Sequence, residues 1–235
     1  MARGITQAQE AAKSGGGGGS RDELIVEEGA RALIRLLGDG SDSDVLFGVY
    51  AFHSSGNETT YKDEGLCRRE LGEPCLACDQ NLPRRLQIVC WVWVYGVYHL
   101  QQKMPDWEAV EVRGRGRAFK ETVNAPKILR KGVGKARSFL ELFVNYYDEY
   151  GALNDRDYLL SRSGSGFNTS YSIIPRGDKK ELSREQAQAR STLPDILEYY
   201  TQKANQLAPV SLNGVDEHSL TLDEDTEEDQ NEPPF

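Results

Sequence analysis

The sequence predicts a mainly β protein with peripheral helices, in the α+β class, and three observations support this prediction. Residues Leu86 to Tyr98 alternate their side chains in the pattern of a long strand. Several shorter apolar runs, rich in Val, Ile, Phe and Tyr, are separated by glycine-containing turns. Helical spacing and helix-start signals are confined mainly to two stretches in the second half of the chain. The 235 residues leave room for one domain of roughly 150 residues plus tails.

Composition divides the chain into four parts. Residues 1–20 end in a glycine-rich run and are expected to be a flexible segment. Residues 21–180 are expected to form the core, with a cysteine-rich subdomain at about 53–84. Residues 181–207 are expected to be helical, and residues 208–235 form an acidic tail whose composition predicts disorder.

The core is expected to begin with two strands. Residues 30–37 (ARALIRLL) could form a short helix, but Gly29 and Gly38 bound a segment too short to be stable as an isolated helix, so we expect a strand. Val45 to Phe52 is the second expected strand, and it ends beside His53.

The loop that follows contains a candidate metal site. Cys75 and Cys78 are spaced C-x-x-C, and two thiolates on one tight turn can share a metal ion. Cys67 is a natural third ligand, while His53 and Cys90 compete for the fourth position. Cys90 alternates in register with the apolar residues of its strand, which is typical of a buried side chain. The sequence therefore predicts one structural zinc ion held by His53, Cys67, Cys75 and Cys78.

Three other roles for these cysteines fit the sequence less well than a structural zinc. A disulfide would need an oxidising compartment, and the sequence shows no signal peptide. A redox C-x-x-C pair usually begins a helix of a βαβ unit, which is not expected here. A catalytic zinc would need an open coordination position, and four protein ligands leave none.

The strand over Leu86 to Tyr98 has two faces of different character. One is small and apolar, as a core requires: Ile88, Cys90, Val92 and Val94. The other carries the aromatic residues Trp91, Trp93 and Tyr95. These rings could be buried against the cysteine-rich loop, or they could stand exposed in a groove where unpaired bases stack.

A basic region follows this strand. A strand beginning near Trp107 and another over Val123 to Arg130 are expected, and the segment between Arg113 and Arg137 holds a single acid, Glu121. Glycines between the first arginines let the backbone bend while each guanidinium reaches a phosphate. The bases of this region are Arg113, Arg115, Arg117, Lys120, Lys127, Arg130, Lys131, Lys135 and Arg137.

The rest of the core alternates helix and hairpin. A helix from about Gly134 to Tyr150 is expected, with an apolar stripe of Phe139, Leu140, Phe143, Val144 and Tyr147 facing the core. Residues 155–162 and 169–175 are expected to pair around a glycine-rich turn. Side chains of this pair could line the same basic groove: Arg156, Tyr158, Arg162, Phe167 and Tyr171. A last helix is expected from Ser183, with Gln186 at the capping-box position, to about Gln206.

Charge is segregated along the chain. The formal net charge is −9, from 37 acidic and 28 basic residues. Nine acids and no Lys or Arg follow Val215, so the rest of the chain is neutral overall and its basic centre stands out. A basic centre with a detached acidic tail suggests a polyanion binder. No apolar run is long enough to span a membrane, and no catalytic triad or P-loop is present.

The order of these features resembles the bacteriophage single-stranded DNA-binding proteins of replication. The resemblance covers about Ile25 to Pro175: a strand, His53, the three cysteines, an apolar strand, a basic strand, a helix, and the run DRDYLLSRSGSGFNTSYSIIP from Asp155. The acidic tail ending in Phe235 strengthens it. The family's N-terminal basic segment is missing, because residues 1–20 carry only Arg3 and Lys13.

The resemblance implies an OB-fold barrel with an inserted zinc subdomain, and no enzymatic activity. It implies binding of single-stranded DNA with little sequence preference during phage replication, recombination and repair, in the cytoplasm of the host bacterium. The tail, with Phe235 at its tip, is then expected to recruit a polymerase, helicase or primase. A zinc-containing transcription or protein-interaction adaptor without single-strand preference is the alternative; a zinc-dependent nuclease or deaminase would need an open metal position.

Overall fold

The computed structural model describes residues 22–38, 46–54, 64–112, 116–133, 139–165 and 168–207. Its described strands are β1 (Arg31–Leu36), β2 (Phe47–Ser54), β3 (Glu64–Leu66), β4 (Arg84–His99), β5 (Glu108–Val112), β6 (Gly116–Gly132), β7 (Asp157–Ser163) and β8 (Ser170–Arg176). Its helices are the short η2 (Arg68–Leu71) and α2 (Leu76–Asp79), then α3 (Phe139–Tyr150), α4 (Arg184–Thr192) and α5 (Ile196–Leu207). The expected strands and hairpin are all present, and residues 31–36 are a strand and not a helix.

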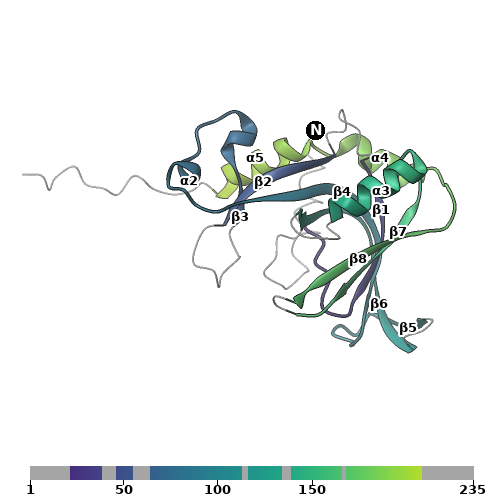
Figure 1. Ribbon diagram of the computed structural model, residues 1–235. Helices are drawn as coiled ribbons and strands as arrows, with labels where there is room; N and C mark the ends of the chain where they lie inside the picture. The colour runs from purple at the N-terminus through teal and green to yellow at the C-terminus, as the bar shows by residue number, and fades with distance from the viewer. Residues whose placement is uncertain are drawn as a thin grey trace, which may run out of the picture.

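The strands form one strongly curved, antiparallel sheet built on the long strand β4 (Figure 1). β6 pairs along one edge of β4, while β2 and then β1 share its other edge. β7 pairs with β1, and β8 pairs with β7. In the described part of the chain β8 and β6 form no ladder, so the sheet is not closed. The α+β class is therefore confirmed, whereas the closed barrel implied by the resemblance is not.

A bulge in the middle of β4 changes which side chains share a face. The register shifts between Val94 and Gly96 opposite β6, and Asn124 on that partner strand has a φ of 42°. As a result Trp93 and Tyr98 lie on the same face of the sheet, although their numbers differ by an odd count, because a bulge inserts one unpaired residue. Tyr95 is that inserted residue.

The main core fills the inner side of the curved sheet. The apolar face expected for β4, made of Ile88, Cys90, Val92 and Val94, is fully buried there. It meets Ile34 of β1 and side chains of the other strands and of α3. Cys90, a free cysteine, therefore packs as a small hydrophobic side chain.

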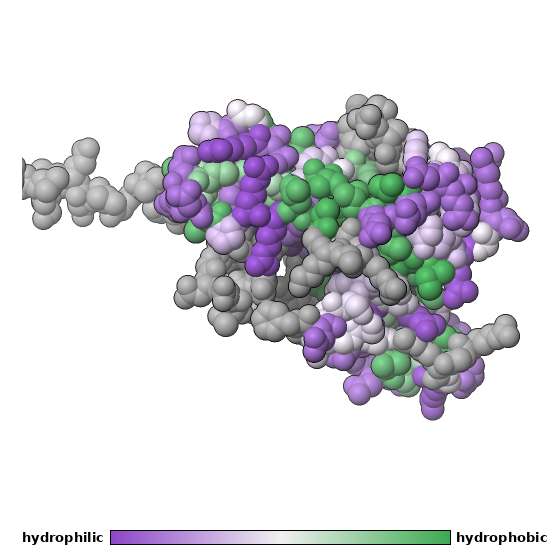
Figure 2. Space-filling model, viewed as in Figure 1, coloured by the Kyte–Doolittle hydropathy of each residue, from purple (hydrophilic) through white to green (hydrophobic). Residues whose placement is uncertain are grey.

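The apolar stripe expected on α3 is only partly correct. Phe139 and Phe143 are buried, and Leu140 is half-buried against the core. Val144 and Tyr147 are instead exposed, because the face of α3 that packs against the core includes Leu142 and Tyr146 in their place. Apolar side chains accordingly gather on the surface over α3 in the middle of Figure 2, whereas the loop that carries α2, at the left, is largely hydrophilic.

The last two helices cover the outer face of the sheet. Ser183 caps α4 through a complete capping box with Gln186, as expected, and the helical segment breaks around Pro194 before α5 begins. Ile196 and Tyr200 of α5 are buried against β4 and β6. No helix in the described ranges is both long and apolar enough to cross a membrane.

Candidate metal centre and outer-face groove

The candidate metal ligands come together at the tip of the loop between β2 and β4. One ligand atom from each of His53, Cys67, Cys75 and Cys78 lies within 4.8 Å of the others. The Nε2 atom of His53 is 3.2 Å from the Cys78 sulfur, and the sulfurs of Cys67 and Cys78 are 3.5 Å apart. Four N and S donors at these separations match a tetrahedral metal site with no open position.

Local structure explains how the ligands are placed. His53 lies near the end of β2, and Cys67 follows β3, where its amide donates to the carbonyl of Ala51. Cys75 is the N-cap of α2 and Cys78 lies on its single turn, where the amide of Asp79 donates back to the Cys75 carbonyl. This turn brings two thiols of a C-x-x-C pair to the same side of the backbone.

The electrostatics of the cluster also suit a cation. Burial acts to raise the pKa of Cys75, but hydrogen bonds from the backbone amides of Cys78 and Arg68 outweigh it and lower that pKa. Burial and hydrogen bonds to Cys67 and Cys75 raise the pKa of Cys78. One thiolate is thus favoured while its neighbour resists ionisation, and a bound cation would remove that conflict. The choice of His53 over Cys90 as fourth ligand is borne out by the geometry, since Cys90 lies in the main core.

The tryptophan face of β4 is buried, so Trp91 and Trp93 do not form an exposed row in a groove. Trp91 is 4% exposed and Trp93 is 8% exposed. The indole of Trp91 donates to the Pro194 carbonyl at 3.1 Å and meets the ring of Tyr199 edge-on at 5.3 Å. The burial alternative is therefore correct, although it is α5 and the turn before it, not only the cysteine-rich loop, that cover the rings.

Energetic magnitudes favour keeping this cover in place. Each large apolar side chain that loses its contacts costs about 1.5–3 kcal/mol, and several aromatic rings are buried together here. Stacking one base on an exposed ring contributes only about 1–3 kcal/mol. Uncovering Trp91 and Trp93 would therefore cost more than the bases could return, and we assign both residues to the core.

The other residues predicted to bind DNA fall on both faces of the sheet. Lys120 and Arg130 share the outer face, where Arg130 pairs with Glu23 at 3.5 Å. Lys127 and Lys131 lie on the opposite face, across from Val92 and Ile88. Arg117 stacks on Phe119. The expectation of one common groove for all of these residues is therefore wrong.

The hairpin residues do not gather in that groove either. Tyr158 is fully buried in the core, and Arg156 pairs with Asp155 at 2.7 Å while lying over Tyr150. Arg162 donates to the carbonyl of Val26. Tyr171, directly opposite Arg162, packs against the core. Six predicted site residues lie outside the described residues: Arg113, Arg115, Lys135, Arg137, Phe167 and Phe235.

The outer face does contain a groove, beyond the end of the helical cover. It has a volume of about 520 Å³ and lies where β1, β4, β5, β7 and the end of β8 converge. Arg31 and Arg176 supply positive charge and Tyr98 an aromatic ring, while Leu33, Leu159 and Val112 are its apolar side chains. The remaining lining residues are Glu111, Asp157 and Gly177.

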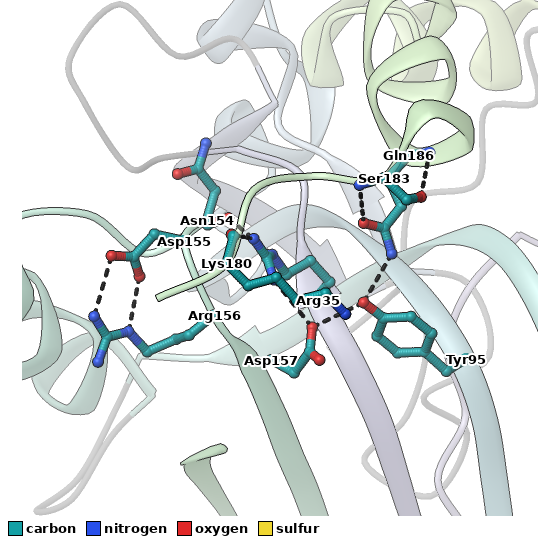
Figure 3. Close-up of polar contacts among 9 residues, drawn as sticks. All are labelled: Arg35, Tyr95, Asn154, Asp155, Arg156, Asp157, Lys180, Ser183 and Gln186. Carbon is teal, nitrogen blue, oxygen red and sulfur yellow. Dashed lines mark hydrogen bonds and ion pairs between the residues drawn. The ribbon is translucent and has the colours of Figure 1, made fainter. Parts of the chain in front are cut away.

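A buried polar network joins this groove to the helical cover (Figure 3). Arg35 is completely buried and pairs with Asp157 at 3.2 Å; its guanidinium also donates to the carbonyls of Asn154 and Lys180. The hydroxyl of Tyr95 donates to the same Asp157 oxygen at 2.8 Å, and Gln186 of α4 donates to that hydroxyl at 2.8 Å. Asp157 is thus neutralised on the inner side of the groove, and the other charged residues of the lining are Arg31, Arg176 and Glu111.

Sequence analysis missed the three main polar residues of the groove, Arg31, Tyr98 and Arg176. Their shared face depends on the bulge at Tyr95 and on the pairing of β1 with β7. The β1–β7 pairing joins residues over 100 positions apart. The one available signal was local: Arg31, Leu33 and Arg35 alternate along the first strand with apolar core residues. A search against protein-family models and against curated proteins finds no match to this chain.

Proposed function

We propose that this protein binds single-stranded DNA with little sequence preference, and that it acts in phage DNA replication, recombination and repair. The observation that carries the proposal is the outer-face groove, in which Arg31 and Arg176 accompany the ring of Tyr98 above apolar side chains. Cations contact phosphates of any sequence, and every base has a flat face that can stack on an aromatic ring. A single strand presents both groups at once.

The fold supports the same proposal. Five of the strands follow the order β6-β4-β1-β7-β8, with a gap between the first and the last. A partly open, five-stranded sheet of this kind agrees with an OB-fold, which binds oligonucleotides on its outer strand face. In this proposal one zinc ion occupies the His53 and cysteine cluster and fixes the inserted loop, because four N and S donors are a typical structural zinc set.

The volume of the groove favours a single strand over a duplex. About 520 Å³ is comparable to pockets that hold one small-molecule ligand, which corresponds to one or two nucleotides. Bases paired inside a duplex could not reach the Tyr98 ring. The acidic tail with Phe235 at its tip remains our proposed docking segment for replication proteins.

The proposal is tested by titrating the full-length protein with single- and double-stranded oligonucleotides of one sequence. Tyr98→Ala should weaken single-strand affinity by roughly 1–3 kcal/mol, the value of one stacked base. Arg176→Gln should reduce the slope of log affinity against log salt by about 0.7, as expected for one lost phosphate contact on a single strand. Arg68→Gln is the matched control, because Arg68 is an exposed arginine on the metal-binding loop, paired with Glu73.

Two outcomes would reject the groove as the binding site. One is equal affinity for duplex and single strand, which would favour the adaptor function. The other is full affinity in the folded Tyr98→Ala and Arg176→Gln variants.

A further inference from the structure

A second group of cations lies on the opposite face of the sheet, at the gap between β6 and β8. The ammonium of Lys131, near the end of β6, lies 4.2 Å from the centre of the Tyr171 ring on β8. The guanidinium of Arg162, directly opposite Tyr171 on β7, lies 6.0 Å from the same ring. Two positive charges therefore lie near the same aromatic ring. They lie beside the gap between β6 and β8, where the described residues form no strand pairing.

In the described part of the chain no carboxylate lies within ion-pair distance of Lys131 or Arg162. The acid that acts on Lys131, Glu23, is already engaged by Arg130 at 3.5 Å and by Lys203 at 3.9 Å. Arg162 uses one terminal nitrogen to donate to the Val26 carbonyl, and its buried Nε finds no acceptor among the described residues.

The pKa of Lys131 is shifted by this arrangement of charges. Burial, opposed by Glu23 and assisted by the nearby charges of Arg162 and Arg130, lowers the pKa of Lys131 to about 8. A half-buried ammonium beside an unsatisfied guanidinium nitrogen is costly, since buried donors and charges are normally paired. An anion with several acceptor oxygens would complement both groups.

We propose that Lys131 and Arg162, arranged around Tyr171, form a binding site for a phosphate group. A phosphate oxygen can accept from the Arg162 guanidinium while the ammonium of Lys131 neutralises its charge. The ligand is either a phosphodiester of a bound strand or free inorganic phosphate. The site is separate from the outer-face groove and does not depend on the function proposed for that groove.

Anion binding at this place must be linked to the proton on Lys131. The bound phosphate stabilises the ammonium, so the pKa of Lys131 should rise on binding, and a rise of one unit corresponds to a tenfold preference for the charged form. Below pH 8 the ammonium is already present and affinity is at its full value. Above pH 8 affinity should fall, by up to tenfold per pH unit, until the pKa of the complex is reached.

The experiment follows the lysine side-chain NMR signals of the full-length, isotope-labelled protein as pH is raised. Titrations in chloride, in inorganic phosphate and with a short single-stranded oligonucleotide are compared at equal ionic strength. Lys131, assigned with a Lys131→Arg variant, should show a pKa raised by about one unit or more. Lys127, on the same face of β6, is the internal control and should not respond.

Each outcome decides the proposal. A response to phosphate alone or to the oligonucleotide alone supports the site and identifies its ligand. No response to phosphate or to the oligonucleotide overturns the proposed site, and Lys131 then has only a structural contact with Tyr171. Arg162→Gln should diminish the response at Lys131, and an undiminished response in a folded variant also overturns the site. A Tyr98→Ala variant that loses strand binding but keeps the phosphate response would separate this site from the groove.

Discussion

At the scale of single residues, the metal centre depends on four side chains that are close in space and moderately close in sequence. Cys78→Ser should release the metal and lower the thermal midpoint of the domain, because metal binding free energy contributes directly to folding. Cys90→Ser should keep the metal, since Cys90 lies in the main core, although a hydroxyl buried there will cost some stability. Elemental analysis of both purified variants checks the pair. A metal-free wild-type protein, or metal loss in the Cys90 variant, would contradict the assignment.

Lys131 should also leave a signature in the pH dependence of folding. Its pKa is about 8 in the folded protein, against an ordinary lysine value of 10.5, so the unfolded chain binds more protons between these values. Stability should therefore rise with pH above 8, by about 1 kcal/mol per pH unit, before tyrosines begin to ionise. Denaturant unfolding measures the change in stability between pH 7.5, which lies below this range, and pH 9.5, which lies within it. Lys131→Met should abolish the rise, and an unchanged rise in that variant would point to another group.

At the scale of secondary-structure elements, α5 covers the apolar cluster on the outer face of the sheet that contains Trp91 and Trp93. Ile196 is fully buried and Tyr200 is 6% exposed, and both pack with Trp91 and Trp93. Ile196→Ala should cost about 2–5 kcal/mol, as for other buried aliphatic side chains. Thr192→Ala, at the exposed end of α4, is a suitable control and should change stability little. Equal unfolding midpoints for the wild type and Ile196→Ala would show that the cover is not packed as described.

The same cover predicts what tryptophan fluorescence will report. Because Trp91 and Trp93 stay beneath α5, a bound single strand should leave their accessibility to a soluble quencher unchanged. Acrylamide quenching with and without an oligonucleotide measures this, with Trp107→Phe removing the remaining tryptophan, which stacks on His99. Protection or exposure of the two rings on binding would mean that the helices move.

At the scale of the whole molecule, charge separation is the dominant property. The nine acids after Val215 could compete with a nucleic acid for the positive groove and for the cation pair at Lys131 and Arg162. Truncation after Val215 should therefore raise single-strand affinity, most strongly at low salt, where screening is weakest. Deleting Phe235 alone should leave that affinity almost unchanged. Affinity measured at two salt concentrations tests both changes, and weaker binding after truncation would contradict this role of the tail.

The extent to which sequence predicted this molecule follows from the range of each interaction. The metal ligands were identified because a C-x-x-C turn is a local geometry, and the core face of β4 because strand alternation is local too. The burial of Trp91 could not be predicted from its neighbours in sequence, since the residues that cover it lie about 100 positions further along the chain. The position of Tyr98 was equally hidden, because one bulged residue reverses the alternation beyond it. A clue did exist in the aromatic pair Tyr199 and Tyr200, which a solvent-exposed helix would have little reason to carry.

The late position of α5 has a consequence for biosynthesis. A ribosome delivers β4 and β6 well before residue 196, so the nascent chain displays Trp91, Trp93 and Ile128 while their cover is still being translated. At roughly 5–20 residues per second, that interval lasts several seconds. An unshielded aromatic strand is a site for chaperone capture or for association between neighbouring nascent chains. We therefore expect ribosome-bound chains that end before α5 to aggregate, and chains that extend past it to remain dispersed.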